Sequence, residues 1–427
     1  MALSRRHWLV CIALAVVAVV GGCGGGSSDS AKVRIINASL DYGALDVYFD
    51  GTIKHSNVAV GSTSGYIEYE VKSSKTLKVT RAGSAAAVLE ATVSTAGNTD
   101  YVYVFYGNEG NLRLSYYTEN EADASSGKAK LRVLNGSTDS GALDLYASAS
   151  ATEITDLIAK SSSISPAGAS AWVEFDKGTY KVWLTASGDK SDIRLAIPSV
   201  TLDDKKLVTI IVTPSKGGAL VHAQVLVQQG AVSSVENASA RLRLVAGLDQ
   251  GTRVTVNSTA TQRLLSNTSP SISSYVLVPK GSTNLTVQSN ATEYASLTMD
   301  LAAGTDNTLL AYGTATQPIA KVMSDDNRAP TSSSKTKMRL INGFAPAVGP
   351  LTLSADYFPV ASSIAVGDAS PYAQISSGGY SRLDVTEPGS SAPLYLASDV
   401  TLSAQSVYTV FMLGSRAVPV GILRKDR

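Results

Sequence analysis

Histidine and cysteine, two residue types widely used for acid–base and nucleophilic catalysis, are rare in this 427-residue chain. After Cys23 the sequence has only two histidines, His55 and His222, and no further cysteine. Triad chemistry needs an imidazole beside a nucleophile and an orienting acid, and these histidines lie far apart. The string GSTSG at 61–65 resembles a nucleophile elbow, but Thr63 takes the nucleophile's place and no helical pattern follows. We therefore expect no enzyme and no zinc or iron site.

Acidic residues offer a second kind of chemistry. Asp46 and Asp50 lie on the polar side of an alternating stretch, Asp144 repeats Asp46 in a later stretch, and 325–327 reads Asp-Asp-Asn. Oxygen ligands from several loops can bind calcium between β-domains, although no D-x-D-x-D-G loop is present. Two interpretations stay open, a structural calcium ion or acids on a solvated face. The sequence predicts no cofactor.

Tyrosine is the third notable type, with 19 residues against 6 phenylalanines and 3 tryptophans. In a strand such as YVYVFY, from Tyr101, both faces cannot belong to one core, so some rings must meet solvent, a neighbouring domain or a ligand. Either the tyrosines contact a glycan or peptide, or they reflect strand propensity alone. The candidate ligand contacts are Tyr66, Tyr69, Tyr103 and Tyr106.

The N-terminus indicates where such residues must work. Residues 1–22 combine a basic head, an apolar run from Trp8 to Val20 and two small glycines, which is typical of a secretory signal peptide. The run is shorter than the roughly twenty residues that span a bilayer. An ordinary signal peptide cleaved near Gly26 would remove Cys23 from the mature chain.

The stretch Val20-Gly21-Gly22-Cys23 resembles the lipobox of bacterial lipoproteins. This resemblance implies cleavage after Gly22, a diacylglyceryl thioether on Cys23 and acylation of its new amino group with a chain such as palmitate. Each buried methylene contributes about 0.8 kcal/mol, so several chains anchor firmly. Gly24 follows where inner-membrane lipoproteins usually carry Asp, which implies the outer membrane, on its periplasmic or surface face. Residues 23–31, rich in Gly and Ser, form a flexible tether.

The composition limits the remaining partners. The mature chain has no disulfide, so its stability must come from apolar cores, which 44% hydrophobic and 17% charged residues allow. A net charge of +1 with dispersed Lys and Arg argues against nucleic acid. Membrane contact through the lipid anchor, and a protein or glycan partner, remain.

The chain repeats one motif: KVRIINAS from Lys32, KLRVLNGS from Lys130, RLRLVAGL from Arg241 and KMRLINGF from Lys337. Each motif alternates apolar and polar residues, which predicts a strand that opens a unit of roughly a hundred residues. The predicted units, numbered 1 to 4, span residues 32–118, 130–228, 240–323 and 336–424.

Each unit continues with a second strand, a hairpin and a closing pair, which predicts six or seven strands and an antiparallel Ig-like β-sandwich. Only 151–161 allows a short helix. Tyr101 at a strand entrance forms either a tyrosine corner or an ordinary buried aromatic. Polar linkers at 119–127, 228–239 and 324–336 are expected on the surface, the third as a hinge and protease site.

The openers, LDVYFDG at 45–51, the following hairpin and YVYVFYG at 101–107 resemble the domain of unknown function 4397 family. The resemblance is clear in units 1 and 2, weaker in unit 4 and marginal in unit 3. It implies Ig-like repeats in a secreted bacterial protein and carries no activity.

Two main hypotheses follow. The first is a non-enzymatic envelope lipoprotein whose tandem modules act as a structural spacer or as an adhesion or protein-interaction body. The second is a glycan- or peptide-binding lipoprotein that uses exposed tyrosines of unit 1.

Overall fold

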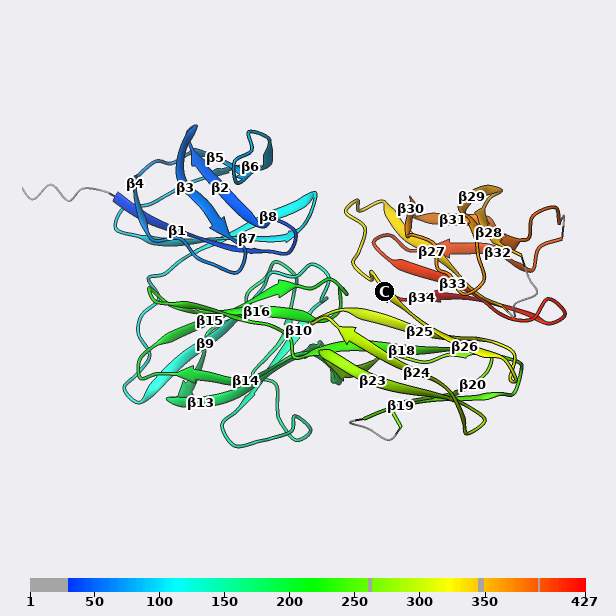
Figure 1. Ribbon diagram of the computed structural model, residues 1–427. Helices are drawn as coiled ribbons and strands as arrows, with labels where there is room; N and C mark the ends of the chain where they lie inside the picture. Colours follow the sequence, from blue (N-terminus) through cyan, green and yellow to red (C-terminus); the bar gives the residue numbers. More distant parts are fainter. Residues whose placement is uncertain (1–29, 260–262, 345–348, 391) are drawn as a thin grey trace, which may run out of the picture.

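The computed structural model describes residues 30–259, 263–344, 349–390 and 392–427. The predicted signal peptide (1–22), Cys23 and nearly all of the tether lie outside these residues. The described residues form strands and turns and no helix, so the all-β class and the tandem β-sandwiches are confirmed (Figure 1). Residues 151–160, the one stretch with a helical pattern, form turns.

The first two sandwiches contain seventeen of the strands. Unit 1 contains β1 (Ser30–Ser39), β2 (Ala44–Phe49), β3 (Thr52–Ala59), β4 (Ile67–Glu70), β5 (Lys75–Arg81), β6 (Ala87–Val93), β7 (Asp100–Asn108) and β8 (Asn111–Thr118). Unit 2 contains β9 (Lys128–Asn135), β10 (Leu143–Ser148), β11 (Ser161–Ile164), β12 (Val173–Asp176), β13 (Gly178–Ala186), β14 (Asp189–Leu202), β15 (Leu207–Pro214), β16 (Val221–Val227) and β17 (Val232–Val235).

The last two sandwiches repeat the same order. Unit 3 contains β18 (Ser239–Gly247), β19 (Arg253–Ser258), β20 (Leu265–Thr268), β21 (Ser271–Ile272), β22 (Val276–Pro279), β23 (Gly281–Ser289), β24 (Thr292–Leu301), β25 (Asp306–Gly313) and β26 (Pro318–Asp325). Unit 4 contains β27 (Lys335–Phe344), β28 (Leu351–Ala355), β29 (Phe358–Ile364), β30 (Ala373–Ser376), β31 (Gly378–Thr386), β32 (Tyr395–Leu402), β33 (Val407–Gly414) and β34 (Pro419–Lys425).

Each unit is built from two sheets with matching strand orders. In unit 1 the sheet that holds the opening strand runs β4-β1-β7-β8, and the other runs β3-β2-β5-β6. We call the first the interface sheet and the second the outer sheet, in all four units. In the interface sheet the opener pairs in parallel with a late strand, as Val33 of β1 does with Tyr101 of β7. The expectation of wholly antiparallel sheets is therefore wrong for one pair of strands in each unit, because strand alternation carries no information on direction.

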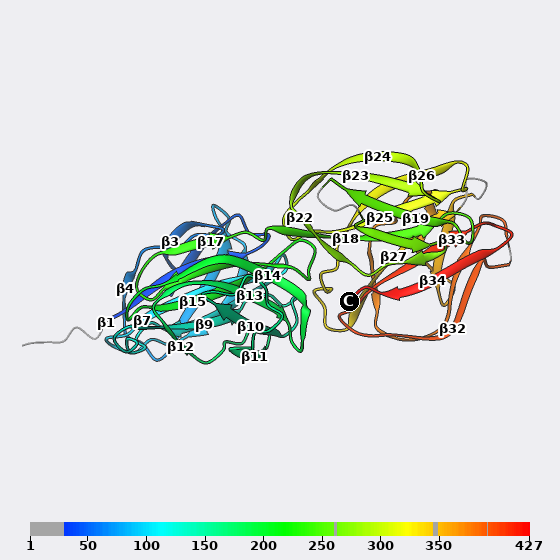
Figure 2. The same cartoon turned by 90° about the horizontal axis from the view of Figure 1, so that it is seen from below.

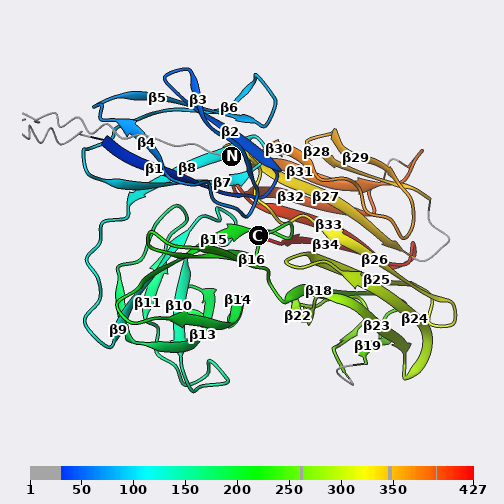
Figure 3. The same cartoon turned by 60° about the vertical axis from the view of Figure 1, so that its left-hand side comes forward.

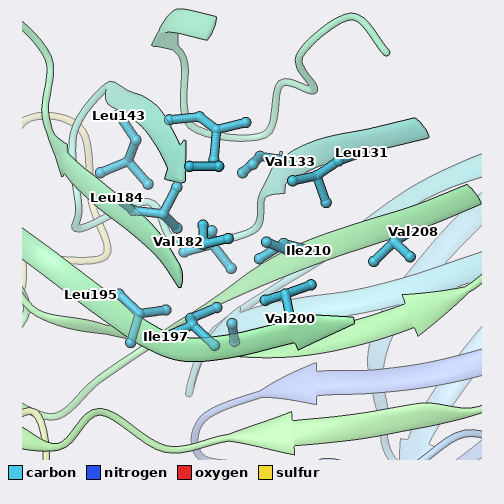
Figure 4. Close-up of a cluster of buried hydrophobic side chains, with 14 of the residues drawn as sticks. Leu131, Val133, Leu143, Val182, Leu184, Leu195, Ile197, Val200, Val208 and Ile210 are labelled. Atoms are coloured by element: carbon cyan, nitrogen blue, oxygen red, sulfur yellow. The ribbon is translucent and has the colours of Figure 1, made fainter. Parts of the chain in front are cut away.

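The apolar residues of the two sheets close one core per unit. In unit 2, Leu131 and Val133 of β9 lie opposite Val182 and Leu184 of β13, and all four residues are fully buried (Figure 4). Equivalent clusters fill units 1, 3 and 4. These cores replace the missing disulfides, since burial of apolar area is the main stabilising term.

The units are arranged in two pairs. Units 1 and 2 stack with their interface sheets face to face, and units 3 and 4 do the same (Figures 1 and 3). Seen from below, units 1 and 2 overlap on one side of the molecule and units 3 and 4 on the other (Figure 2). A pair therefore contains two sandwich cores and one apolar contact between them.

The linkers between units are not simple surface segments. Glu119 in the first and Asp325 and Asn327 in the third are at most 3% exposed. The second linker contains the edge strand β17, which pairs with β16. The expectation that polar linkers run on the surface is therefore wrong at these residues, because their side chains pair with groups at the interfaces between units.

Candidate functional site

The two histidines lie in different units and are packed into the fold. His55 is 3% exposed and stacks on Tyr69, with the ring centroids 6.1 Å apart. Desolvation lowers the pKa of His55 to about 4. The Nδ1 atom of His222 accepts a hydrogen bond of 3.0 Å from the Asn237 amide, and burial lowers the pKa of its ring as well. Both rings are therefore neutral at pH 7.

The repeated acids Asp46 and Asp144 bind backbone amides of their own outer sheets. The two carboxylate oxygens of Asp46 accept hydrogen bonds of 2.7 Å from the Asn57 amide and 3.0 Å from the Gly83 amide. Asp144 accepts equivalent bonds from Ser163 and Gly188, at 2.7 and 2.9 Å. These carboxylates are at most 7% exposed, so they act as fixed structural acceptors and not as acids on a solvated face.

The acidic linker segment 325–327 pairs with cationic side chains of the protein. Asp325 forms an ion pair with Arg339, and Asp326 lies 2.8 Å from Arg328 and 2.9 Å from Lys337. Within the described ranges, no group of three or more His, Cys, Asp or Glu side chains is placed to hold a metal ion. The positive charges that calcium would supply here are already present as guanidinium and ammonium groups.

The candidate tyrosines do not form an exposed surface. Tyr69, Tyr103 and Tyr106 are 3%, 0% and 2% exposed, so the expectation that they contact a ligand from the surface is wrong. Tyr103 and Tyr69 pack into the core of unit 1, whereas Tyr106 faces unit 2. Tyr66 is partly exposed, but its hydroxyl donates a hydrogen bond to the Glu119 carboxylate. The outer face of β7 is covered by unit 2, so a neighbouring domain is the one of the three expected surroundings that the structure shows there.

Tyr101 forms the tyrosine corner. Its hydroxyl accepts a hydrogen bond of 2.9 Å from the amide of Ala96, five residues upstream. Tyr408 of unit 4 does the same with Ser403, at 3.0 Å. The corner interpretation is confirmed, and the ring fixes the chain as it enters the strand that pairs in parallel with the opener.

The contact within each pair is apolar at its centre. Between units 1 and 2 the buried residues that meet are Ile36, Ala38, Val102, Val104, Tyr106, Leu134, Ile211 and Leu226. Between units 3 and 4 they are Val245, Leu310, Tyr312, Ile341, Phe411 and Leu413. Apart from Leu226, which lies in the closing strand β16, both sets come from the outward side of the opener and of its parallel partner. Opening strands are therefore buried on both faces, as in a sheet inside a larger core.

An arginine stands at the same place in all four openers, on the face that meets the paired unit. Each guanidinium lies over an aromatic ring of its own unit, with 4.3–5.0 Å between the guanidinium carbon and the ring centroid. Such stacking is favourable when the cation is desolvated. The pairs are Arg34 with Tyr66, Arg132 with Trp172, Arg243 with Tyr275 and Arg339 with Tyr372.

Acids at the ends of closing strands complete this arrangement between units 3 and 4. Asp325, the last residue of β26, pairs with Arg339 of unit 4 and lies 3.5 Å from Arg243 of unit 3. Asp426, just behind β34, pairs with Arg243 and accepts a hydrogen bond of 2.5 Å from Thr409. Burial alone would lower the pKa of Arg243, but the neighbouring Tyr275, Asp325 and Asp426 raise it above its usual value.

The interface between units 1 and 2 holds one such acid. Glu119, just behind β8, pairs with Arg34 and accepts the hydrogen bond from Tyr66. Arg132 lies between the rings of Tyr117 and Trp172, at 4.2 and 4.3 Å, and burial lowers its pKa. All these cationic and acidic side chains make contacts that hold the paired units together.

This network was not foreseen from the sequence. The signals were present in two places: an arginine at the third position of each opening motif, and an acid where the first, third and fourth closing strands end. An arginine repeated on one face of several buried strands indicates a buried cation, which needs a partner elsewhere in the chain.

Comparisons with known proteins agree with the repeat pattern. The model of the family described as domain of unknown function DUF4397 matches residues 31–146 and 242–353, together more than half of the chain. Each match starts in an opening strand, β1 or β18, and ends in the second strand of the next unit, β10 or β28. No curated protein matches the chain.

Two solved structures show only a distant likeness. The Bacillus anthracis TIE protein matches at 10% identity and a TM-score of 0.16, over 87% of this chain and 66% of its own length. A family CBM26 module of Eubacterium rectale Amy13K, solved in complex with maltoheptaose, matches at 15% identity and a TM-score of 0.17, over 47% of this chain and 97% of its own. This chain thus spans just under two thirds of the first protein, and TM-scores this low carry no argument.

The described residues contain no helical segment of the length and hydropathy that a bilayer crossing requires. Four sandwiches with the same opening motif, and a family model that starts anew at the third, lead to one conclusion. The chain belongs to the family of the domain of unknown function DUF4397.

Proposed function

We propose that this protein is a non-enzymatic lipoprotein of the cell envelope, held at the outer membrane through acyl chains on Cys23. Its four sandwiches act as a structural spacer or protein-interaction body that presents units 3 and 4 away from the anchor. One observation carries this proposal: charged and polar side chains of the protein are used for structural contacts. Arg243 forms an ion pair between two units, and Asp46 accepts backbone hydrogen bonds within one unit.

The pairing of units supports a spacer. A flexible string of domains has small, polar contacts between neighbours. Here the paired units share an apolar contact bordered by buried ion pairs, so each pair moves as one body. A stiff body holds its two ends at a fixed separation. A spacer requires this property, whereas an enzyme or a flexible linker does not.

We do not retain the alternative that exposed tyrosines of unit 1 bind a glycan or peptide. Three of its four proposed contact residues are buried in a core or between units. The fourth, Tyr66, has its hydroxyl bound to Glu119 and its ring under Arg34.

The anchor is tested with the chain's two cysteines. Cells producing the Cys23→Ser protein should incorporate no labelled palmitate into it, and globomycin should not change its processing. The Cys11→Ser protein is the matched control, because Cys11 lies in the predicted signal segment and should leave labelling and membrane fractionation unchanged. Equal labelling of the two variants would contradict lipidation at Cys23.

The role of the body is tested on intact cells. Added protease followed by detection of unit 4 separates a surface-displayed body from a periplasmic one. A hydrolytic or transferase activity that co-purifies with the chain, and persists at constant specific activity through further purification, would contradict the non-enzymatic proposal.

A further inference from the structure

A hairpin tip in unit 4 departs from its counterpart in unit 1. Strands β28 and β29 are joined by the two-residue turn Asp356-Tyr357, with φ angles of 44° and 69°. In unit 1 the same turn between β2 and β3 is Asp50-Gly51, with φ angles of 48° and 78°. Both positions require the left-handed region, where glycine is unstrained and a bulky residue is an outlier.

The first residue of the turn has one role in both units. Asp50 accepts a hydrogen bond of 3.0 Å from the Thr76 amide of β5. Asp356 accepts one of 2.9 Å from the Arg382 amide of β31. The backbone of the two tips is therefore held in the same way, and the difference lies in the residues that follow.

In unit 4 those residues are aromatic and face solvent. Tyr357 is 75% exposed and Phe358 is 77% exposed, whereas unit 1 has Gly51 and Thr52 there. The Tyr357 ring centroid lies 5.1 Å from the guanidinium carbon of Arg382, which steadies one ring face. A strained turn that displays two unburied rings is not explained by the folding of unit 4, and backbone strain of this kind gathers at contact sites.

A pocket of matching chemistry lies at the other end of the chain. It has a volume of about 230 Å³ and opens between units 1 and 2. Its apolar lining includes Ala38, Leu40, Val60, Pro214, Ala223 and Val235. Ala38 also belongs to the apolar contact of the first pair, so the pocket continues that interface to the surface, and Val60 is 47% exposed on its rim.

We propose that the Tyr357-Phe358 tip of one molecule docks into this pocket of a second copy. A cavity of about 150 Å³ is enough to hold benzene, so the pocket accommodates one aromatic side chain. The tip and the pocket lie in different pairs, hence the contact joins unlike surfaces and links molecules head to tail, in rows or in closed rings. Its area is far below the roughly 1,600 Å² of a standard interface, so association is weak in dilute solution and favoured among molecules crowded in one membrane.

The chain is well suited to a thiol crosslinking test, since no cysteine follows Cys23. The full-length protein carrying Pro359→Cys and Val60→Cys, which keeps both rings of the tip, is produced in cells, and isolated membranes are treated with a short bis-maleimide. We expect a ladder of dimers and higher multimers on a denaturing gel. Neither single variant should give the ladder.

The matched control keeps Pro359→Cys and moves the second thiol to Ile158→Cys, a residue of unit 2 that is 82% exposed and outside the pocket. A ladder of equal strength with this control would mean random collision and would overturn the proposal. Dimers from Pro359→Cys alone would mean a tip-to-tip contact and would overturn it as well, as would the absence of any multimer with the Val60→Cys pair.

A second variant separates docking from folding. Replacing Tyr357 by Gly and Phe358 by Thr copies the turn of unit 1 and relieves its strain. With a reporter pair, Pro359→Cys and Leu40→Cys, this change should reduce the multimer band at least tenfold while the thermal unfolding of the protein is unchanged or improved. An undiminished band would show that the aromatic rings do not make the contact.

Discussion

The two interfaces between paired units share a design and differ in charge. Between units 3 and 4, two arginines meet two aspartates, and all four side chains are at most 2% exposed. Between units 1 and 2, Arg34 pairs with Glu119, and the salt bridges of the described residues include none to Arg132. The charges of these arginines and aspartates balance in the interface between units 3 and 4, whereas the interface between units 1 and 2 retains an excess of positive charge.

The difference arises at one position. Asp426 follows the last strand of unit 4, and Gln228 occupies the equivalent place behind β16 in unit 2. There the guanidinium of Arg34 donates to backbone carbonyls of Gly230 and Val227, at 2.7 and 3.3 Å, in place of a second carboxylate. The same apolar contact is thus compatible with two arrangements of polar partners, and we expect the one with two carboxylates to couple its two units more tightly.

The largest expected effect comes from removing the acid that serves both arginines. Asp325→Ala leaves Arg243 and Arg339 short of a buried partner, which should cost about 3–5 kcal/mol. Glu119→Ala should cost about 1–3 kcal/mol, because backbone carbonyls remain on Arg34. Hydrogen exchange of β18 and β27 in the first variant, and of β1 and β9 in the second, measures each loss locally.

The matched control for this pair of variants is Asp368→Ala. Asp368 pairs with Lys321 at the surface, both side chains being 48% exposed, so the loss should stay below about 1 kcal/mol. Equal losses in Asp325→Ala and Glu119→Ala would refute the idea that the two interfaces differ in strength.

The next prediction concerns how the stability of unit 1 and that of unit 4 depend on pH. His55 has a pKa of about 4 in the folded state and about 6.5 when unfolded, so the unfolded state takes up the proton first as the pH falls. Stability of unit 1 is therefore full above pH 6.5 and declines toward pH 4, by about 3 kcal/mol. Unit 4 has Ala361 at the corresponding position in β29 and lacks this loss.

Denaturant unfolding of the wild type and of His55→Leu between pH 7 and 4 measures this effect. The difference between the two proteins isolates the imidazole from the carboxylates that titrate in the same range. A difference that does not change with pH would show that His55 is accessible to protons in the folded state.

The tyrosine corners should affect the two pairs equally. Tyr101→Phe and Tyr408→Phe each remove the acceptor of one backbone amide, and each should cost about 1–2 kcal/mol. Hydrogen exchange at Ala96 and Ser403 reports the loss directly. Unequal costs would show that the corners, like the interfaces, have diverged between the pairs.

The smallest effect tests the two hairpin turns. Tyr357→Gly should stabilise unit 4 by about 0.5–1 kcal/mol, because it relieves a positive φ angle. The reciprocal change, Gly51→Tyr, should destabilise unit 1 by a similar amount. Thermal unfolding of both variants measures this, and a loss of stability in Tyr357→Gly would mean that the aromatic ring is anchored within unit 4.

Sequence patterns were sufficient for what depends on near neighbours. Alternation in KVRIINAS predicted the opening strand, and the spacing before Tyr101 predicted its corner as one of two interpretations. Both features are local, since the partner of Tyr101 is only five residues away.

What depends on distant partners was not predictable. Alternation separates the two faces of a strand, but it does not say what covers the polar face. Arg34 looked solvated, and its acid lies 85 residues away, in a segment that resembled a linker. For Tyr106 of β7 the sequence left solvent, a neighbouring domain and a ligand open for the same reason, because nothing local indicated that unit 2 covers the outer face of unit 1.

Face-to-face stacking restricts how such a protein can grow. A chain with an odd number of sandwiches would leave residues such as Ile341, Phe411 and Leu413 of one sheet uncovered, and apolar patches of this kind promote aggregation. Gain or loss of repeats is therefore tolerated in twos, which sets the step by which evolution or an engineer can change the reach of this molecule.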